Sequence, residues 1–418
     1  MSNKNSKRVQ YINSNLLGRK REPIEIVQEE PIELIMKELE TETTIDRNEV
    51  IDMCQDLLEG ELSSFHRDSM MQYLNYASTA QFPPQMTALD ASQPWMVYWI
   101  ANSLATVKPS SIDDELKRKI VNKLFTISPE KGPFGGGSGQ LPHIAGTYAA
   151  INALSLCDNI DGCWDEINKP AIYDWLLSLK QPDNSFITCN PVGETDTRGT
   201  YCALSVASML GIMTDELTAG VAEYLESCQT YEGGYGGTPV GDEAHGGYTF
   251  CAVASLFILG RSDLIDIEGL MEWCSARQYN EEMGLSGRNN KLVDGCYSFW
   301  VGATAAMIEA LTGVECLDKS ALQRYILNCC QSDERPGFRD KPGKSPDFYH
   351  TNYVLLGLAY AESSFSFKDS RTDNPFAITS TQRKNVENSA NLIPISPIYG
   401  LPIDSLNKFH DHFVTHKK

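Results

Sequence analysis

The strongest constraint on the fold of this chain is an internal repeat with a period of about fifty residues. Six similar segments each begin with polar residues or glycine and continue into small and apolar residues that are typical of a buried helix. An aromatic landmark lies near the start of each helical stretch: Trp99, Tyr148, Tyr201, Phe250, Phe299 and Tyr353, separated by 49 to 54 positions. A second landmark repeats in step: Phe134, Phe186, Tyr235, Leu285 and Phe338. Two landmarks that keep one period indicate a repeated structural unit.

A unit of this length accommodates two helices and a loop. Helical patterns at residues 172–179, 217–228, 264–277 and 321–329 fill the intervals between landmarks, and few segments alternate as an exposed strand would. Propeller blades have a similar length, but the strand signals they need are absent. Helical hairpins can form an open solenoid or a closed ring, and the many alanines in the landmark helices favour tight packing around a centre. The sequence therefore predicts an all-α fold, an α6-α6 (α/α) barrel of about six helical hairpins.

Charge and composition divide the chain into four expected regions. Residues 1–21 carry basic and no acidic groups, which predicts a flexible basic tail, and residues 22–80 form an acidic helical N-terminal segment. The barrel is expected over residues 81–365. Residues 366–418 are rich in Ser, Thr, Asn and Pro and are expected to be an extension that covers the barrel or is partly disordered.

The overall composition excludes several classes of function. A formal net charge of −20 argues against nucleic acid as a ligand, because phosphate backbones need a basic surface. No apolar run is long enough for a membrane span, and the polar N-terminus lacks the apolar core of a secretory signal. We therefore expect a cytoplasmic protein without stable membrane insertion. The 12 cysteines among 418 residues are too sparse for a disulfide scaffold, so most should be small buried side chains.

Polar residues gather three and five positions before the aromatic landmarks. They are His143, Asp196, Arg198, His245, Asp294, Cys296 and His350. Equivalent positions of a repeat lie at one end of a barrel, so these side chains should surround one axis. Among them, Asp294, Cys296 and His350 offer oxygen, sulfur and nitrogen ligands, the set of a catalytic zinc site with an open fourth position. A buried cysteine, a helix-capping aspartate and a loop histidine are the alternative that spacing alone leaves open.

Basic and aromatic residues accompany this cluster in the sequence. Arg288 and Lys291 precede Asp294 by six and three positions, and together with His245 and Tyr248 they could stabilise a diphosphate. The alternative is that the two basic residues neutralise neighbouring acids. Asp340 is a candidate ligand for a magnesium ion. Aromatic residues expected at the same end of the barrel either line a long apolar pocket or belong to an ordinary core: Trp95, Trp99, Tyr201, Tyr248, Phe250, Trp300, Tyr349 and Tyr353.

Several long motifs resemble the β subunits of protein prenyltransferases, and most closely the members that transfer farnesyl. These motifs are FGGGSGQLPHIAGTYAAINAL, DTRGTYCA, GGYGG, HGGYTFC, GRNNKLVDGCYSFWVGA and DKPGKSPDFYHTNY, within roughly residues 60–365. The resemblance implies an α6-α6 barrel and a heterodimer with a helical-repeat α subunit. It also implies zinc-dependent transfer of farnesyl from farnesyl diphosphate to the cysteine of a C-terminal C-a-a-X sequence.

The resemblance also implies roles for individual residues. One zinc ion per subunit would be held by Asp294, Cys296 and His350. Diphosphate contacts would come from His245, Arg288, Lys291 and Tyr297, with a lysine from the α subunit. Isoprenoid contacts would come from Arg198, Tyr201, Tyr248, Cys251 and Trp300. Contacts with the substrate peptide would come from Trp95, Trp99 and Tyr349.

Two positions distinguish members of the family. In the type I geranylgeranyl-transferring members a small residue replaces the tryptophan that blocks a longer isoprenoid, and a lysine replaces the magnesium-linked aspartate. Trp95 and Asp340 are both of the farnesyl type. The alternatives are a type I geranylgeranyltransferase β subunit, a terpene cyclase with a similar barrel, and a binding module without catalysis. The cyclase alternative lacks the expected D-x-D-D motif, since Asp113 and Asp114 lie in a helical stretch between repeats.

Overall fold

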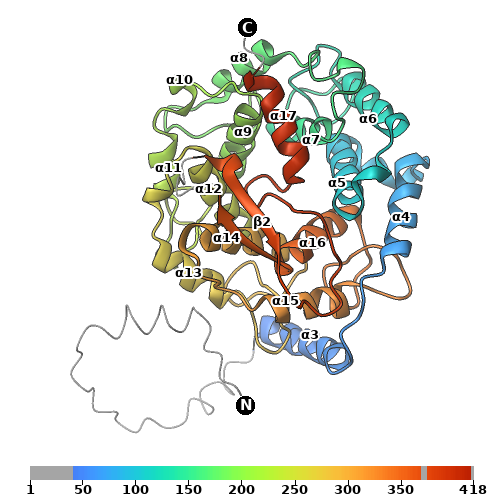
Figure 1. Ribbon diagram of the computed structural model, residues 1–418. Coiled ribbons are helices and arrows are strands. Elements are labelled where there is room, and N and C mark those ends of the chain that lie inside the picture. Colours follow the sequence, from blue (N-terminus) through green and yellow to red (C-terminus); the bar gives the residue numbers. More distant parts are fainter. Residues whose placement is uncertain (1–40, 369–373, 416–418) are drawn as a thin grey trace, which may run out of the picture.

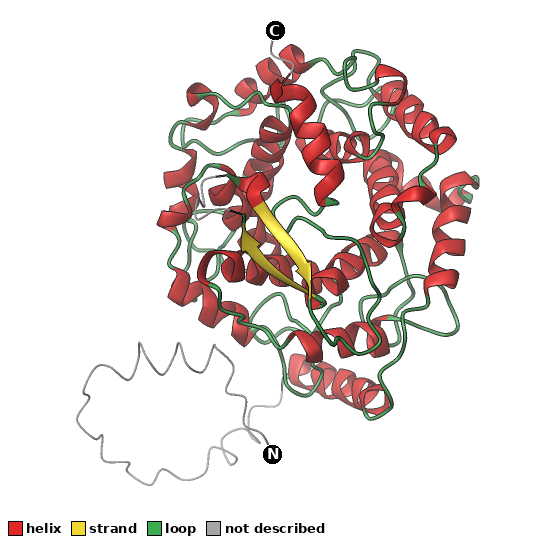
Figure 2. Ribbon diagram, viewed as in Figure 1, coloured by secondary structure: helices red, strands yellow, loops and turns green. Residues whose placement is uncertain are grey.

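The computed structural model describes residues 41–368 and 374–415 and confirms an all-α barrel (Figures 1 and 2). Within this described part, six helices form an inner ring: α5 (Gln93–Val107), α7 (Ile144–Ser155), α9 (Thr197–Met209), α12 (Gly246–Ile258), α14 (Tyr297–Thr312) and α16 (Phe348–Ala361). Each packs against the next, and α16 packs against α5. The ring is therefore closed, and the open solenoid is excluded.

A second set of helices surrounds the ring (Figure 1). They are α4 (Arg67–Thr79), α6 (Asp114–Ile127), α8 (Lys169–Leu179), α10 (Asp215–Thr218), α11 (Val221–Ser227), α13 (Ile267–Ala276) and α15 (Lys319–Arg324), which η5 (Tyr325–Cys330) continues. Short 3₁₀ segments lie between them: η1 (Pro84–Ser92), η2 (Pro109–Ser111), η3 (Ile160–Gly162), η4 (Ser262–Leu264) and η6 (Pro375–Ala377). Inner helices are buried on nearly every face, whereas an outer helix such as α6 buries only Ile120, Val121, Leu124 and Ile127. This difference explains why inner helices are rich in small apolar residues and outer helices are amphipathic.

One expected outer helix is interrupted. The pattern over residues 217–228 predicted a single helix, but the structure has α10 and α11 on either side of Gly220. Gly220 adopts φ +74°, and a Cβ atom there would collide with the side chain of Asn184. The left-handed conformation and the close approach both require glycine. The helix is therefore broken at Gly220, although the apolar pattern of the sequence predicts one continuous helix.

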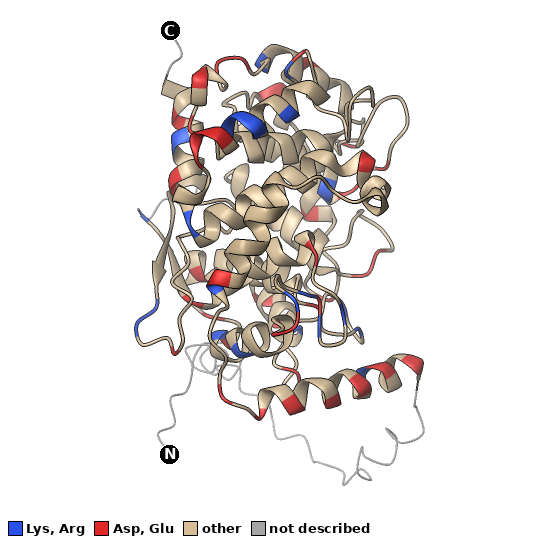
Figure 3. Ribbon diagram, turned by 90° about the vertical axis from the view of Figure 1, so that its right-hand side faces the viewer, with Lys and Arg blue, Asp and Glu red and all other residues tan. Residues whose placement is uncertain are grey.

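The N-terminal helix lies against the outside of the barrel. Helix α3 (Glu42–Leu58) packs on η5, where the side-chain amide of Asn328 donates to the carbonyls of Leu57 and Glu61 at 2.8 and 3.0 Å. Acidic residues follow its length (Figure 3). The expected basic tail and the first part of the acidic segment lie outside the described residues.

The C-terminal residues cover one end of the ring (Figures 1 and 2). Strands β1 (Ser363–Phe367) and β2 (Ile378–Gln382) form an antiparallel hairpin, and helix α17 (Ile403–Thr415) contacts α7 and α9. Between them, Ile398, Tyr399 and Leu401 are fully buried. The hydroxyl of Tyr201 in α9 donates to the carbonyl of Ile398 at 2.8 Å. This segment is therefore part of the barrel core.

Candidate metal centre and apolar cavity

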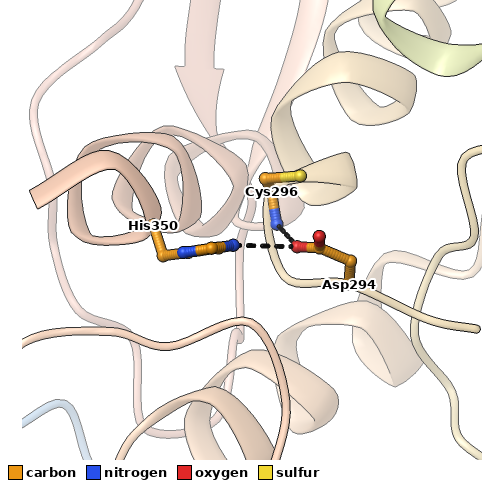
Figure 4. Close-up of side chains that lie close together, drawn as sticks. All are labelled: Asp294, Cys296 and His350. Atoms are coloured by element: carbon orange, nitrogen blue, oxygen red, sulfur yellow. Dashed lines mark hydrogen bonds and ion pairs between the residues drawn. The ribbon is translucent and has the colours of Figure 1, made fainter. Parts of the chain in front are cut away.

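Asp294, Cys296 and His350 converge at one end of the barrel. Asp294 and Cys296 lie at the N-terminus of α14, and His350 lies in the first turn of the neighbouring α16. One ligand atom from each residue lies within 4.8 Å of the other two. Figure 4 shows His350 reaching Asp294, with 3.3 Å between Nε2 and Oδ1, and Asp294 accepting from the amide of Cys296 at 2.8 Å. Within residues 41–368 and 374–415, this is the single cluster with the composition and spacing for a metal ion.

A neighbouring carboxylate orients the imidazole of His350. Asp347 is the N-cap of α16: one carboxylate oxygen accepts from the backbone N–H of His350 at 2.7 Å, and the other lies 2.7 Å from Nδ1. Burial opposes a charge on His350, but its hydrogen bonds with Asp294 and Asp347 outweigh burial and raise its pKa to about 10. A carboxylate on Nδ1 directs Nε2 toward the centre of the cluster, as in many metal sites.

These residues fit a zinc ion. The Cys296 side chain is buried, and burial together with the Asp294 carboxylate raises the pKa of its thiol. A thiolate at this position therefore requires a cation beside it. Zinc binds oxygen, nitrogen and sulfur ligands at about 2.0–2.3 Å, and small rotations bring atoms already within 4.8 Å to such distances. Three protein ligands leave a fourth position for a substrate.

A cavity of about 370 Å³ adjoins the cluster inside the barrel mouth. Cys296 lies in its wall, so the candidate metal centre opens directly into it. Half of the other lining residues are Trp, Tyr or Cys: Trp95, Trp99, Tyr148, Tyr201, Cys202, Cys251, Tyr297, Trp300, Tyr349 and Tyr353. The volume is within the usual range for small-molecule sites, roughly 300–1,000 Å³. A larger groove of about 1120 Å³ lies outside the ring beside α4 and α6 and contains none of the predicted site residues.

His245 and Tyr297 form a hydrogen-bonding pair at the cavity wall. His245 caps α12, and its Nδ1 accepts from the backbone N–H of Gly247 at 3.0 Å. The ring proton of the neutral form is therefore assigned to Nε2, which lies 3.1 Å from the Tyr297 hydroxyl. Burial, followed by the charges of Arg288 and Arg198, lowers the pKa of His245 to about 4. Gly287 packs on the Tyr297 ring so closely that an added Cβ would overlap it.

The two predicted diphosphate cations lie on the loop that precedes α14 and do not line the cavity. Arg288 pairs with Glu243 at 3.3 Å, so in this structure it neutralises an acid. The carbonyl of Lys291 accepts from the Tyr279 hydroxyl at 3.0 Å. This loop also joins α12, because the carbonyl of Gly287 accepts from Gly246 at 2.8 Å. The loop that carries both cations thus begins beside His245.

The other charged residues of the predicted site, Arg198 and Asp340, are both paired with neighbouring side chains. Arg198 lines the cavity, pairs with Asp196 at 2.6 Å and lies 5.3 Å from the ring of Tyr248, which itself is outside the lining. Asp340 does not line the cavity, and its carboxylate is paired with the ammonium group of Lys341. Burial, with the charge of Asp294, raises the pKa of Asp340.

Some cavity residues had no individual role assigned from the sequence, although His143, Asp196 and Tyr353 were expected near this end of the barrel. His143, Asp196, Tyr148 and Tyr353 all line the cavity. Their positions carried a signal, since the first two precede landmarks by five residues and the last two are landmarks. Phe250, for which the sequence left a pocket or an ordinary core open, belongs to the core: it is fully buried, at 5.3 Å between its ring centroid and that of Trp300, and does not line the cavity. Asp113 caps the outer helix α6, away from the cavity.

Comparison with known proteins agrees with these features. The prenyltransferase alpha-alpha toroid domain matches residues 65–401. The chain is 55% identical over 416 residues to the protein farnesyltransferase subunit beta of Saccharomyces cerevisiae, covering 97% of this chain and 96% of the relative. It is 39% identical over 386 residues to the subunit of the same name from Schizosaccharomyces pombe, covering 90% and 97%.

Geranylgeranyl-transferring proteins are more distant in sequence. The geranylgeranyl transferase type-1 subunit beta of Arabidopsis thaliana is 35% identical over 254 residues, covering 55% of this chain and 65% of the relative. The solved structure titled Candida albicans protein geranylgeranyltransferase-I complexed with GGPP has a TM-score of 0.67 and 20% identity, covering 84% of this chain and 99% of that chain. This last similarity establishes the common fold.

No helix among the described residues has both the length and the apolar composition to cross a membrane. The resemblance inferred from the sequence motifs is confirmed by the extent and identity of the matches. The chain therefore belongs to the family of protein farnesyltransferase β subunits.

Proposed function

We propose that this chain acts in the cytoplasm with a helical-repeat prenyltransferase α subunit and transfers farnesyl to protein cysteines. The donor is farnesyl diphosphate, and the acceptor is the cysteine thiol of a C-terminal C-a-a-X sequence. The observation that carries this proposal is the opening of the Asp294–Cys296–His350 cluster into an aromatic cavity beside His245 and Tyr297. In this arrangement a thiol-activating metal at the cluster, an apolar chain in the cavity and an anionic leaving group beside His245 and Tyr297 would lie next to one another.

The reaction forms a bond between the cysteine sulfur and C1 of farnesyl and breaks the bond between C1 and a diphosphate oxygen. Diphosphate leaves with the electron pair of that bond, and the thiol proton is released to solvent. Asp294, Cys296 and His350 would hold a zinc ion, whose positive charge would lower the pKa of the substrate thiol. Cys296 serves as a ligand and stays unalkylated.

The residues near the cavity mouth stabilise the departing diphosphate. Neutral His245 donates from Nε2 to the Tyr297 oxygen, which leaves the Tyr297 O–H to donate to a diphosphate oxygen. Burial raises the pKa of Tyr297, so it remains protonated and able to donate. Arg288 and Lys291 add positive charge once Arg288 exchanges Glu243 for the stronger anion. The α subunit contributes a further lysine.

Asp340 is proposed to bind a magnesium ion that accompanies the diphosphate. Carboxylate oxygens are the ligands that magnesium prefers, and burial beside Asp294 already disfavours an unpaired charge on Asp340. Lys341 occupies the carboxylate in this structure. Magnesium would therefore take the place of the Lys341 ammonium group beside the Asp340 carboxylate.

The isoprenoid and the peptide are proposed to contact different parts of the cavity wall. Tyr201, Cys251 and Trp300, on α9, α12 and α14, would contact the isoprenoid, with Arg198 and Tyr248 near its charged end. Trp95, Trp99 and Tyr349 line the α5–α16 side and contact the peptide. The Trp95 and Trp99 rings lie 5.6 Å apart, and Trp99 and Tyr349 are also 5.6 Å apart.

The decisive experiment is a transfer assay on the purified heterodimer. The chain is co-expressed with a prenyltransferase α subunit, stripped of metal and assayed for transfer of labelled farnesyl to C-a-a-X peptides with and without zinc. We expect transfer that depends on zinc and on the peptide cysteine, with farnesyl diphosphate preferred over geranylgeranyl diphosphate. Preference for the longer donor would instead support the type I geranylgeranyl-transferring alternative, and absence of transfer would reject both.

A further inference from the structure

We propose that Arg277, Asn289 and Glu232 form a hydrogen-bonded brace, buried at its Arg277 end, that positions the cationic loop, residues 286–293, relative to His245. The inference rests on the proposed function, because it concerns how Arg288 and Lys291 are presented to diphosphate. None of the three residues lines the cavity or belongs to the candidate metal cluster. They are positioning residues.

The brace is a chain of three hydrogen bonds. The Arg277 guanidinium donates from Nη2 to the side-chain carbonyl oxygen of Asn289. The amide nitrogen of Asn289 donates to Oε2 of Glu232. The other carboxylate oxygen, Oε1, accepts from the backbone N–H of Ala244 at 3.1 Å. The chain thus connects the residue that follows Arg288 with the residue that precedes His245.

Arg277 occupies an unusual environment for a cation. The residue is 4% exposed, and its Nε and Nη1 atoms have no hydrogen-bond partner among the described residues. Its guanidinium lies 5.2 Å from the centre of the Trp273 ring. Burial lowers its pKa, while the nearest charges, Glu232 and Glu243, act in the opposite direction. A buried charge without a direct ion pair is unfavourable for stability. A role in positioning the loop would explain why an arginine nevertheless occupies this site.

The rest of the loop is fixed at its two ends. The backbone N–H of Ser286 donates to the carbonyl of Arg277 at 2.8 Å. Near the other end, the Tyr279 hydroxyl holds the carbonyl of Lys291, and the guanidinium of Arg47 lies 4.3 Å from the Tyr279 ring centre. Between these anchors, Asn290 adopts φ +54°. The brace therefore holds the centre of the loop, where Arg288 and Asn289 are adjacent.

The chemistry of the brace allows a test by exchange of donors and acceptors. Glu232→Gln leaves one acceptor oxygen for two donors, the Asn289 amide and the backbone N–H of Ala244, so one of the two hydrogen bonds is lost and the chain is broken. Adding Asn289→Asp restores it, because the glutamine amide introduced at position 232 can donate to the new carboxylate, which can also accept from Arg277. Arg277→Met removes the buried charge and is expected to preserve or raise the melting temperature.

These variants are prepared as zinc-loaded heterodimers, and their affinities for farnesyl diphosphate, farnesol and a C-a-a-X peptide are measured. We expect Glu232→Gln and Arg277→Met to weaken farnesyl diphosphate binding by about tenfold or more, since small displacements of positioned charges have effects of this size. Farnesol and peptide affinities should stay unchanged, and the double variant E232Q/N289D should recover most of the loss. Asn328→Ala, which removes a buried amide between α3 and η5, is the matched control.

Equal weakening of farnesol and farnesyl diphosphate would overturn the brace, as would an unchanged diphosphate affinity in E232Q and R277M. Failure of the double variant to recover, or the same defect in N328A, would also overturn it. The wild-type heterodimer separates this inference from the proposed function. If the wild type fails to bind or use farnesyl diphosphate, both are rejected, whereas wild-type activity with unaffected variants rejects the brace alone.

Discussion

At the scale of single residues, His245 shows how its surroundings set a protonation state. Burial, then Arg288 and Arg198, lower its pKa to about 4, whereas an unfolded chain has a histidine pKa of about 6.5. The unfolded state therefore binds more protons between these values. The contribution of His245 to the free energy of unfolding should rise with pH across this window and stay constant above it.

NMR titration and denaturation of the heterodimer test this prediction. The ring resonances of His245 should stay constant from about pH 8 down to about pH 5 and titrate below that. His245→Gln should remove this part of the pH dependence of stability. A midpoint near 6.5 would show that the ring is more solvated than its burial indicates.

The candidate zinc ligands permit a prediction that needs no activity measurement. Cys296→Ala or His350→Ala should reduce bound zinc from one per heterodimer to a small fraction, because each removes one of three ligands. Elemental analysis of purified variants gives the ratio directly, and turnover should fall with it. Cys274→Ala, at a buried cysteine outside the cluster, is the control. Stoichiometric zinc with full turnover in either ligand variant would refute the assignment.

Trp95 is predicted to limit the length of the isoprenoid. Its ring lies in the cavity wall, 5.6 Å from the rings of both Trp99 and Tyr148. Trp95→Thr removes this bulk and should shift preference toward geranylgeranyl diphosphate in a competition assay with both donors. Trp175→Thr on outer helix α8 should leave the preference unchanged. An unaltered preference in the Trp95 variant would exclude this role.

At the scale of elements, the N-terminus of α16 couples helix capping to the metal centre. Asp347 caps the helix and contacts Nδ1 of His350 with the same carboxylate. Asp347→Ala should cost about 0.5–2 kcal/mol of stability and weaken zinc affinity by about 10–100-fold. Asp318→Ala removes the cap of α15 and should cost similar stability while leaving zinc affinity unchanged. Calorimetry and zinc titration separate the two effects, and unaltered zinc affinity in the Asp347 variant would contradict the coupling.

The elements also show where pattern reading succeeds and where it stops. Inner helices follow from the repeat because each must bury nearly all of its surface. The division of residues 217–228 into α10 and α11 does not follow from hydrophobic spacing, because it depends on the contact of Gly220 with Asn184 in the loop between α8 and α9. Arg288 and Glu243 likewise pair only because two loops meet in space.

At the scale of the whole molecule, the C-terminal segment contributes to the stability of the ring it covers. The Tyr399 side chain is fully buried and its hydroxyl lies 2.9 Å from that of Ser208, while the carbonyl of Gly400 accepts from Asn102 at 2.9 Å. Tyr399→Ala should cost about 3–5 kcal/mol by leaving a cavity. Tyr399→Phe should cost about 0.5–1.5 kcal/mol for its hydrogen bond. Thermal unfolding of the heterodimer measures both, and a loss below the Phe value in the Ala variant would place this segment outside the core.

The sequence alone determined the repeat, the helical hairpins, the family and the position of the candidate metal ligands. These follow from local information, since residues at equivalent places in each repeat must meet at one end of any barrel. Tertiary structure confirmed the predicted closure by placing α16 against α5, and it alone decided that Arg288 pairs with Glu243 and that Tyr399 enters the core. The brace through Arg277 is of this second kind. The physical reason is that such contacts join side chains that are far apart in the sequence, and a periodic pattern carries no information about which of them will meet.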